Sequence, residues 1–330
     1  MSKKTSTIKR LAQLMVASAL SIGAAHAAWP EHPVNLLVGA PPGGTTDILA
    51  RLIAPYLGEE LSQQVVVVNR GGASGLIASN QVAKSKPDGY NLLFSTSHMA
   101  VFESLYANVP FKPQEDFEPI TLMVKTPYVM VSHPSLPVKT AQELIDYAKQ
   151  NPGKVDYAAS SPGGGQHLAW EMFKRRTETD MMYIPYSGTG ALMTDLLSGR
   201  LVAGIDNVAV LTQYIRRGEF NGLVTTGKNR SPLLPELPTL FEVLGQDKGF
   251  EVVGWFGMFA PKGTPQPVVQ RMDEALKKVL KNPELSKRLL DLGAEVDGGG
   301  PAELAAFLKS ETDRWGKVIK EVGVTLQTAP

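Results

Sequence analysis

Short apolar runs, each bounded by a turn and followed by an amphipathic stretch, recur along this chain. The clearest are residues 34–38, 65–68 and 91–94, and each leads into a turn rich in small residues and then into a helical pattern. Continuous apolar strands separated by amphipathic helices are typical of a parallel sheet covered on both faces. The first part of the chain is therefore predicted to be α/β.

Two longer apolar segments, 120–132 and 251–260, enclose a second α/β series. Within it, a capping box formed by Thr140 and Glu143 predicts a helix that ends at Gln150. Further strands are expected at 155–158, 182–185, 201–205 and 222–226, and the chain after 260 reads mainly as helix, including an amphipathic helix over 301–322.

This order predicts a two-domain clamp in which the chain leaves the first domain, builds the second and returns. The expected boundaries are 28–125 plus 254–330 for a discontinuous first domain and 126–253 for the second. Because ligands of such sheets bind at the carboxyl ends of the strands, the cleft between the domains is the expected site.

The N-terminus predicts export. Four basic residues without any acid precede an apolar run over 11–25, and the sequence Ala25-His26-Ala27 follows. This is the pattern of a secretory signal peptide cleaved after Ala27, whereas the apolar run is short of the ~20 residues that a membrane span needs. We expect a periplasmic protein.

Charge and composition narrow the function further. The 33 basic residues lose four with the signal and leave 29 against 32 acids, so a nucleic acid or an anionic membrane is not the expected partner. The chain has no cysteine, which excludes disulfides, thiolate metal sites and a cysteine nucleophile. Any anion must be held by local geometry.

Glycine-rich turns offer that geometry, since glycine lets a ligand approach the backbone and the first N–H groups of a helix attract anions. Ordinary tight connections are the alternative for each turn. For Asp206, a simple helix N-cap is as plausible as a ligand contact. The four candidate turns are 41–47, 160–167, 186–190 and 206–207.

The same turns give little support to an enzyme. The sequence has no G-x-S-x-G elbow, no H-E-x-x-H or other zinc spacing, no Walker A motif and no Rossmann glycine fingerprint. Ser160 or Ser161 with His98 or His167 is conceivable as a hydrolase pair, but no spacing requires it. We expect no catalysis, no cofactor and no metal.

Several segments, in order along the whole mature chain, resemble the substrate-binding receptors of tripartite tricarboxylate transporters, the Bug receptor family. The resemblance is carried by residues 41–51, 67–70, 82–84, 87–90, 151–154, 166–169, 185–186, 206–207, 255–257 and 292–295.

This resemblance implies a periplasmic, two-domain Venus flytrap of the type II kind with two connecting strands. It also implies capture of a small carboxylate, partly through ordered waters, and delivery to the integral-membrane permease subunits of the transporter. A role as ligand sensor for a signalling partner is the alternative, and we expect a monomer. Carried over to matching positions, the ligand-binding residues are Gly44, Thr45, Ser97 and His98 in one jaw and Ser160, Gly165, Gln166, His167, Tyr186, Gly188, Thr189 and Asp206 in the other.

Two departures from the family pattern bear on the ligand. Family members usually carry an aromatic residue where this chain has Ala40, and an asparagine where it has Leu76. If these positions face the cleft, the pocket is roomier and less polar than usual. The resulting hypothesis is an aromatic dicarboxylate such as terephthalate, with an aliphatic di- or tricarboxylate as the alternative.

Overall fold

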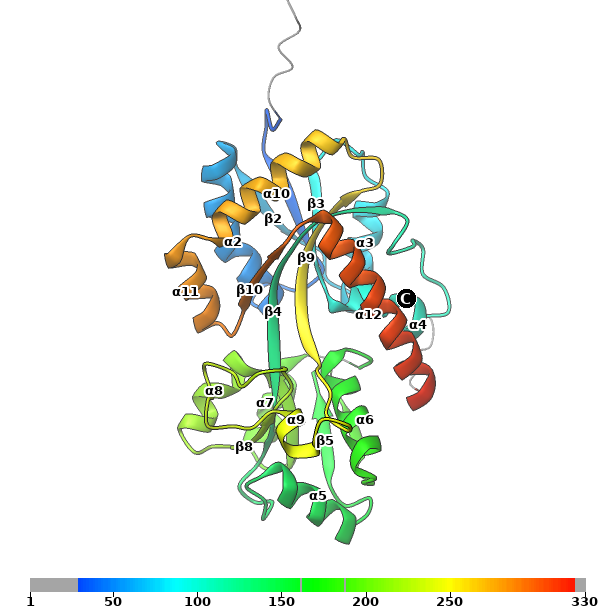
Figure 1. Ribbon diagram of the computed structural model, residues 1–330, viewed down its shortest axis with the longest axis vertical. Helices are drawn as coiled ribbons and strands as arrows, with labels where there is room; N and C mark the ends of the chain where they lie inside the picture. Colours follow the sequence, from blue (N-terminus) through cyan, green and yellow to red (C-terminus); the bar gives the residue numbers. More distant parts are fainter. Residues whose placement is uncertain (1–28, 161, 187, 324–330) are drawn as a thin grey trace, which may run out of the picture.

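The computed structural model describes residues 29–160, 162–186 and 188–323 and has two lobes joined by two long strands (Figure 1). These are β4 (Phe117–Ser132) and β9 (Val253–Pro261), which pair antiparallel along most of β9. The predicted signal peptide lies outside the described residues. The predicted pair of long connecting strands is confirmed.

The upper lobe in Figure 1 contains the first strand-and-helix series. β1 (Val34–Val38) pairs parallel with β2 (Val65–Asn69) and with β3 (Asn91–Thr96), while β9 lies antiparallel to β3. The elements around this sheet are α2 (Thr45–Leu61), η1 (Ala73–Gly75), α3 (Leu76–Ala83), η2 (Ser97–Ala100), α4 (Phe102–Leu105), α10 (Gln266–Leu280), α11 (Pro283–Asp291) and α12 (Pro301–Val322).

The lower lobe contains the second series. β5 (Asp156–Ala159) pairs parallel with β6 (Met182–Pro185) and with β7 (Ala203–Asn207), while β7 and β8 (Asn221–Thr225) lie antiparallel to β4. The predicted capping box at Thr140 is present. The helices here are α5 (Ala141–Gln150), α6 (Gly165–Thr177), α7 (Thr189–Leu197), α8 (Val208–Arg216) and α9 (Leu240–Leu244).

The sheet departs from the sequence prediction in one strand. β10 (Glu295–Gly299) has the sequence Glu-Val-Asp-Gly-Gly, which shows no strand pattern, yet it pairs antiparallel with β4. An ion pair of 2.8 Å between Lys125 and Asp297 joins the two strands. The strand therefore forms because β4 offers it a partner, although its own propensity is poor.

The partners of β4 change at one point along its length. Up to Pro127 it pairs with β9, which joins it to the upper lobe, and from Tyr128 onward it pairs with β7 and β8 of the lower lobe. This change supports the proposed division into residues 28–125 plus 254–330 and residues 126–253, which we retain as a proposal.

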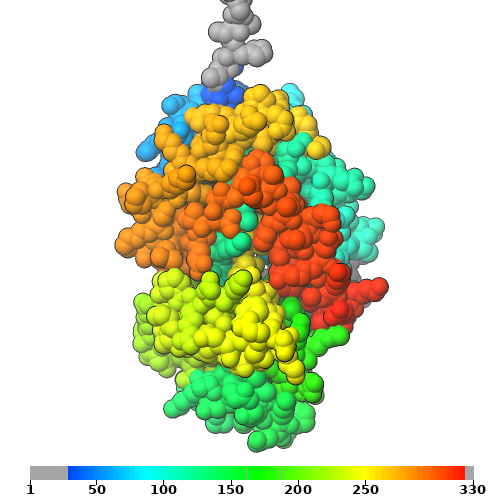
Figure 2. Space-filling view, viewed as in Figure 1, coloured from blue at the N-terminus to red at the C-terminus, as the bar shows by residue number. Residues whose placement is uncertain are grey.

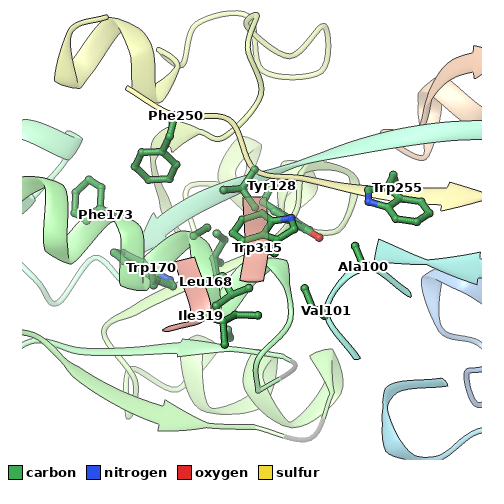
Figure 3. Packing of buried hydrophobic residues seen from close by; sticks show 14 of the residues in the cluster. Ala100, Val101, Tyr128, Leu168, Trp170, Phe173, Phe250, Trp255, Trp315 and Ile319 are labelled. Atoms are coloured by element: carbon green, nitrogen blue, oxygen red, sulfur yellow. The ribbon is translucent and has the colours of Figure 1, made fainter. Parts of the chain in front are cut away.

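Helix α12 makes a second connection between the lobes. It starts in the upper lobe and packs against α6 of the lower lobe, and Figure 2 shows it (red) reaching across the waist of the molecule. Figure 3 shows Trp315 and Ile319 of α12 close to Leu168 of α6, within one buried cluster that also holds Tyr128 and Trp255. We call Trp315, Ile319 and Leu168 the apolar junction.

The helices fit globular packing. The predicted apolar stripe of α12 is confirmed, because Leu304, Leu308, Trp315 and Ile319 are all buried. Searched over the described residues, the helices include none that combines the length and the apolar character needed to cross a bilayer.

Candidate functional site

A cleft with a volume of about 960 Å³ lies between the two lobes. Turns that follow β1 and β3 line it from the upper lobe, and turns that follow β5, β6 and β7 line it from the lower lobe. These turns meet because the carboxyl ends of parallel strands share one edge of a sheet. The four turns that the sequence singled out thus contribute to a single site.

The turn after β1 is held rigid by Asp47. Its carboxylate accepts hydrogen bonds from the Gly43 N–H at 2.9 Å, from Asn69 Nδ2 at 2.8 Å and from Arg51 Nε at 2.8 Å. Burial by itself would raise the pKa of Asp47, but these donors together lower it. The Asn69 amide also donates to the Ala40 carbonyl at 3.0 Å, so the turn is fixed before any ligand arrives.

Asp206 performs the same task in the lower lobe. This carboxylate is 1% exposed and accepts from Thr189 Oγ1 at 2.7 Å, from the Asn207 N–H at 2.7 Å and from Gln166 Nε2 at 3.1 Å. Burial raises its pKa, and the hydrogen bonds, including one from Ser160, oppose that rise. Asn207, not Asp206, occupies the N-cap position of α8, so the simple N-cap reading of Asp206 is wrong.

The positive partial charge around the cleft comes from backbone N–H groups. Among the described residues that line it there is no lysine or arginine. Among the described residues, four α-helices begin at the cleft, with N-cap residues Gly44 for α2, Gly75 for α3, Gly188 for α7 and Asn207 for α8, and none of these caps makes a side-chain hydrogen bond to its helix. Free N–H groups at helix N-termini carry partial positive charge and bind anions.

Two further groups of the cleft stay uncharged near neutral pH. Burial lowers the pKa of His98 to about 4, so its ring is neutral. Burial, with the nearby Asp206 charge, raises the pKa of the Tyr128 hydroxyl, to which Ser97 is hydrogen-bonded. Both can therefore exchange hydrogen bonds with a ligand without adding formal charge.

The structure brings nine of the twelve predicted site residues together around the cleft. The turns after β5 and β6 are also tied directly, by a 2.8 Å hydrogen bond from the Gly188 N–H to the Ser160 carbonyl. The nine are Gly44, Thr45, Ser97, His98, Ser160, Gln166, Gly188, Thr189 and Asp206.

The other three predicted residues lie behind this surface. Gly165 packs against Tyr128, where an added Cβ would stand 3.0 Å from the phenol oxygen. The ring of His167 stacks on Tyr183 with centroids 3.8 Å apart, and its Nδ1 accepts from the Gly163 N–H at 3.0 Å. Tyr186 donates its hydroxyl to Asp195 at 2.7 Å. In this arrangement these residues support the turns and do not line the cleft.

Comparison with known proteins agrees with this architecture. Residues 49–324 match the model of the tripartite tricarboxylate transporter family receptor. This chain belongs to that family. It is 35% identical to Protein BugT of Bordetella pertussis over 301 residues, which cover 91% of this chain and 92% of BugT.

Two solved structures have the same fold. Rhodopseudomonas palustris Rpa4515 with adipate is 36% identical at a TM-score of 0.83, covering 90% of this chain and 100% of that one. MatC (Rpa3494) from the same organism, with bound malate, is 29% identical at a TM-score of 0.77. The match covers 88% of this chain and 100% of that one. The predicted binding-protein fold is confirmed, and so is the prediction of a receptor that is not an enzyme.

Sequence reasoning missed one side of this receptor's cleft. The two long strands supply its floor, through Thr126, Tyr128, Gly254 and Trp255. Only the match at 255–257 hinted at this, because an extended strand has no local signal for which face a ligand will meet. The upper lobe also adds apolar residues to the lining of the cleft, namely Leu93, Phe94, Phe102, Tyr106 and Phe256.

The two departures from the family pattern have different places in the structure. Ala40 lines the cleft, at the turn after β1. Leu76 is buried in the hydrophobic core at the start of α3 and is not among the residues that line the cleft. Only Ala40 bears on ligand size.

Proposed function

We propose that this receptor captures a small dicarboxylate in the cleft and delivers it to the integral-membrane permease subunits of a tripartite tricarboxylate transporter in the periplasmic space. The observation that carries this proposal is the convergence of four helix N-termini without side-chain caps on a cleft that has no cationic side chain among its described lining residues.

Several favourable contributions to carboxylate binding add together in the cleft. A carboxylate at one helix N-terminus gains typically about 0.3–1 kcal/mol, and up to ~2 kcal/mol where the geometry is partly buried. Hydrogen bonds from free N–H groups and from the hydroxyl of Thr45 add to this. Because these donors come from both lobes, the ligand stabilises the closed arrangement over an open one.

The lining suggests the shape of the acid. The small side chain of Ala40 and the apolar residues of the lining suit a hydrophobic body between or beside the carboxylates. We propose an aromatic dicarboxylate such as terephthalate as the ligand. A flexible aliphatic acid is the second candidate, because related receptors hold adipate and malate.

Export is part of the same proposal. A receptor that loads a permease from outside the inner membrane must be secreted, and the first 27 residues have the pattern of a cleaved signal peptide. Mass measurement of the protein recovered from the periplasm tests this, and an intact N-terminus in the cytoplasmic fraction would contradict it.

Thermal-shift and calorimetric titrations of the purified protein test the ligand class. The panel contains terephthalate, adipate, malate and citrate, with terephthalamide and adipamide as uncharged controls. At 100 times the dissociation constant, a true ligand stabilises the fold by about 2.7 kcal/mol. The diamides are expected to have no effect. A panel in which no acid stabilises the protein would overturn the proposed function, and stabilisation by citrate or malate alone would overturn the aromatic ligand.

Delivery to a permease needs a separate test. Uptake of the bound acid is measured in a strain that lacks this chain and in the same strain complemented with it. We expect uptake to fall without the receptor and to return with it. Unchanged uptake with an altered transcriptional response to the acid would favour the sensor alternative.

A further inference from the structure

Three residues of the connecting strands and one residue of β7 form one face at the bottom of the cleft. Thr126 and Tyr128 are two positions apart on β4 and so point to the same side. Thr126 lies directly opposite Gly254 of β9, and Tyr128 directly opposite Asn207 of β7. Directly opposed residues of antiparallel strands share a face. We call Thr126, Tyr128, Asn207 and Gly254 the floor site.

Two polar atoms of the floor site have no hydrogen-bond partner among the residues that the structure describes. Thr126 is 1% exposed and its Oγ1 is unpaired, and the Oδ1 of Asn207 is also buried and unpaired. Unpaired buried polar atoms are rare in folded proteins because each costs about 1–3 kcal/mol. Both atoms belong to residues that line the cleft, so binding of a ligand group would explain why the fold tolerates this unfavourable free energy.

The hydroxyls of Thr126 and Tyr128 lie close against the backbone of Gly254. A Cβ at this position would stand 2.6 Å from Thr126 Oγ1 and 2.8 Å from the Tyr128 hydroxyl oxygen. Both distances are too short for a carbon atom beside an oxygen. Glycine at this position therefore allows the two hydroxyls to lie at the cleft between β4 and β9.

The hydrogen-bonding character of the floor site favours a hydroxyl over a carboxylate. The Asn207 Oδ1 can only accept, and its assignment is supported because Nδ2 is the amide atom that faces the Asp206 carboxylate, at 3.5 Å. The Thr126 hydroxyl both donates and accepts. A carboxylate would leave Oδ1 unpaired and would meet the charge of Asp206, while a hydroxyl satisfies the donor and the acceptor together.

We propose that the floor site binds a hydroxyl group of the captured acid, so that the receptor prefers hydroxylated acids to their unsubstituted parents. This inference rests on the proposed function, since it assigns a second polar group of the same ligand. It adds a specificity determinant on the connecting strands to the carboxylate-binding turns of the two lobes.

Paired acids test the proposal by calorimetric titration. The pairs are malate with succinate, and 2-hydroxyterephthalate with terephthalate, and each pair differs by one hydroxyl. For a pair that binds, we expect wild-type protein to hold the hydroxylated acid about tenfold more tightly. Thr126→Val keeps the shape of the side chain, and we expect it to abolish most of the difference in affinity between the two acids of a pair.

A matched control lies on the same strand. Thr121 is also fully buried, but its hydroxyl donates to Asp273 at 2.9 Å, away from the cleft. Thr121→Val should lower the melting temperature of the unliganded protein and keep the preference for the hydroxylated acid. Thr126→Val should leave the unliganded melting temperature unchanged or raise it, because it removes a hydroxyl that has no partner.

The outcomes separate the two proposals. If no acid binds wild-type protein, the proposed function fails and this inference fails with it. If acids bind but neither pair differs in affinity, or if the difference survives in Thr126→Val, only the inference is overturned. Gly254→Ala adds a second check, because its methyl would displace the hydroxyls of Thr126 and Tyr128 and should reduce the affinity for the hydroxylated acid more than for its parent.

Discussion

The two lobes meet in two contrasting regions, the apolar junction and the cleft. In the junction, Trp315 and Ile319 of α12 are each 3% exposed and pack with Leu168 of the opposite lobe. In the cleft, the facing residues are glycines, hydroxyls and amides around Asp206. The apolar junction is closed to water, whereas the cleft presents hydrogen-bond donors to a ligand.

This difference explains how a binding protein combines a stable fold with a movable mouth. Burial of large apolar side chains is worth about 1.5–3 kcal/mol each and tolerates little separation. Polar groups exchange partners with water at small net cost, so the cleft side can open and close. We infer that α12 keeps the lobes together on its side while the turns separate on the other.

Removing the largest side chain of the apolar junction is the strongest way to break this contrast. Trp315→Ala should destabilise the protein by about 3–5 kcal/mol, because a cavity opens where the two lobes pack. Urea unfolding measures the change. Lys317→Ala, an exposed site on the same helix, is the control, and a loss below about 1 kcal/mol for Trp315→Ala would contradict the assigned role.

Acid titration sharpens the contrast by testing the support behind the cleft. Burial by itself would raise the pKa of Glu171, but hydrogen bonds from His167, Tyr157 and Lys174 lower it to about 2. The stability that Glu171 contributes is present above its ordinary pKa of 4.5 and is lost as the pH falls toward 2.

We therefore expect wild-type protein to exceed Glu171→Gln in stability by about 2 kcal/mol at pH 7, with the gap closing between pH 4.5 and 2. Unfolding curves at a series of pH values measure this gap. Glu284→Gln, at a side chain 74% exposed, should show no comparable trend. A gap that stays constant with pH would argue against the charged network.

Asp206→Ala tests the polar cleft directly, because it removes the carboxylate that holds the turns of the lower lobe. The change leaves the donors of Gln166, Thr189 and Asn207 without their acceptor, which should cost about 1–3 kcal/mol and misplace both lower-lobe turns. Acid binding should fall by more than about a hundredfold. Asp195→Ala on α7 removes a carboxylate that serves Tyr186 and Arg200 instead, and it should lose stability without losing the acid.

The smallest expected effect on stability comes from a larger side chain at Ala40, which lines the cleft. Ala40→Phe should leave folding within about 1 kcal/mol of wild type, since Ala40 borders open volume. Affinity for terephthalate should drop at least about tenfold while malate is retained. Calorimetric titration with both acids decides it, and equal retention of the two would show that Ala40 does not limit ligand size.

Much of the fold could be read from local patterns. The apolar runs and capping signals gave β1, α5 and the two long strands within a few residues, because propensity and tertiary packing agree there. β10 could not be read, since its pairing with β4 overrides a polar, glycine-rich sequence.

The candidate site divides in the same way. Gly44 and Gly188 lie in glycine-rich turns, a composition that indicates close approach of a ligand to the backbone. The structure places both residues at the cleft. His167 and Tyr186 carry equally suggestive side chains but turn toward Tyr183 and Asp195. Side-chain direction depends on neighbours from distant segments, which no local pattern encodes.

The sequence by itself determined the α/β class, the family and the set of turns that meet at the cleft, because each depends on periodicity, glycine placement or segments that occur in order along the chain. Only the tertiary structure decided that the connecting strands form the floor of the cleft and that α12 joins the lobes. It also decided that Thr126 is left without a partner. The physical reason is that strand register and the packing of distant helices set which face of a residue meets the ligand.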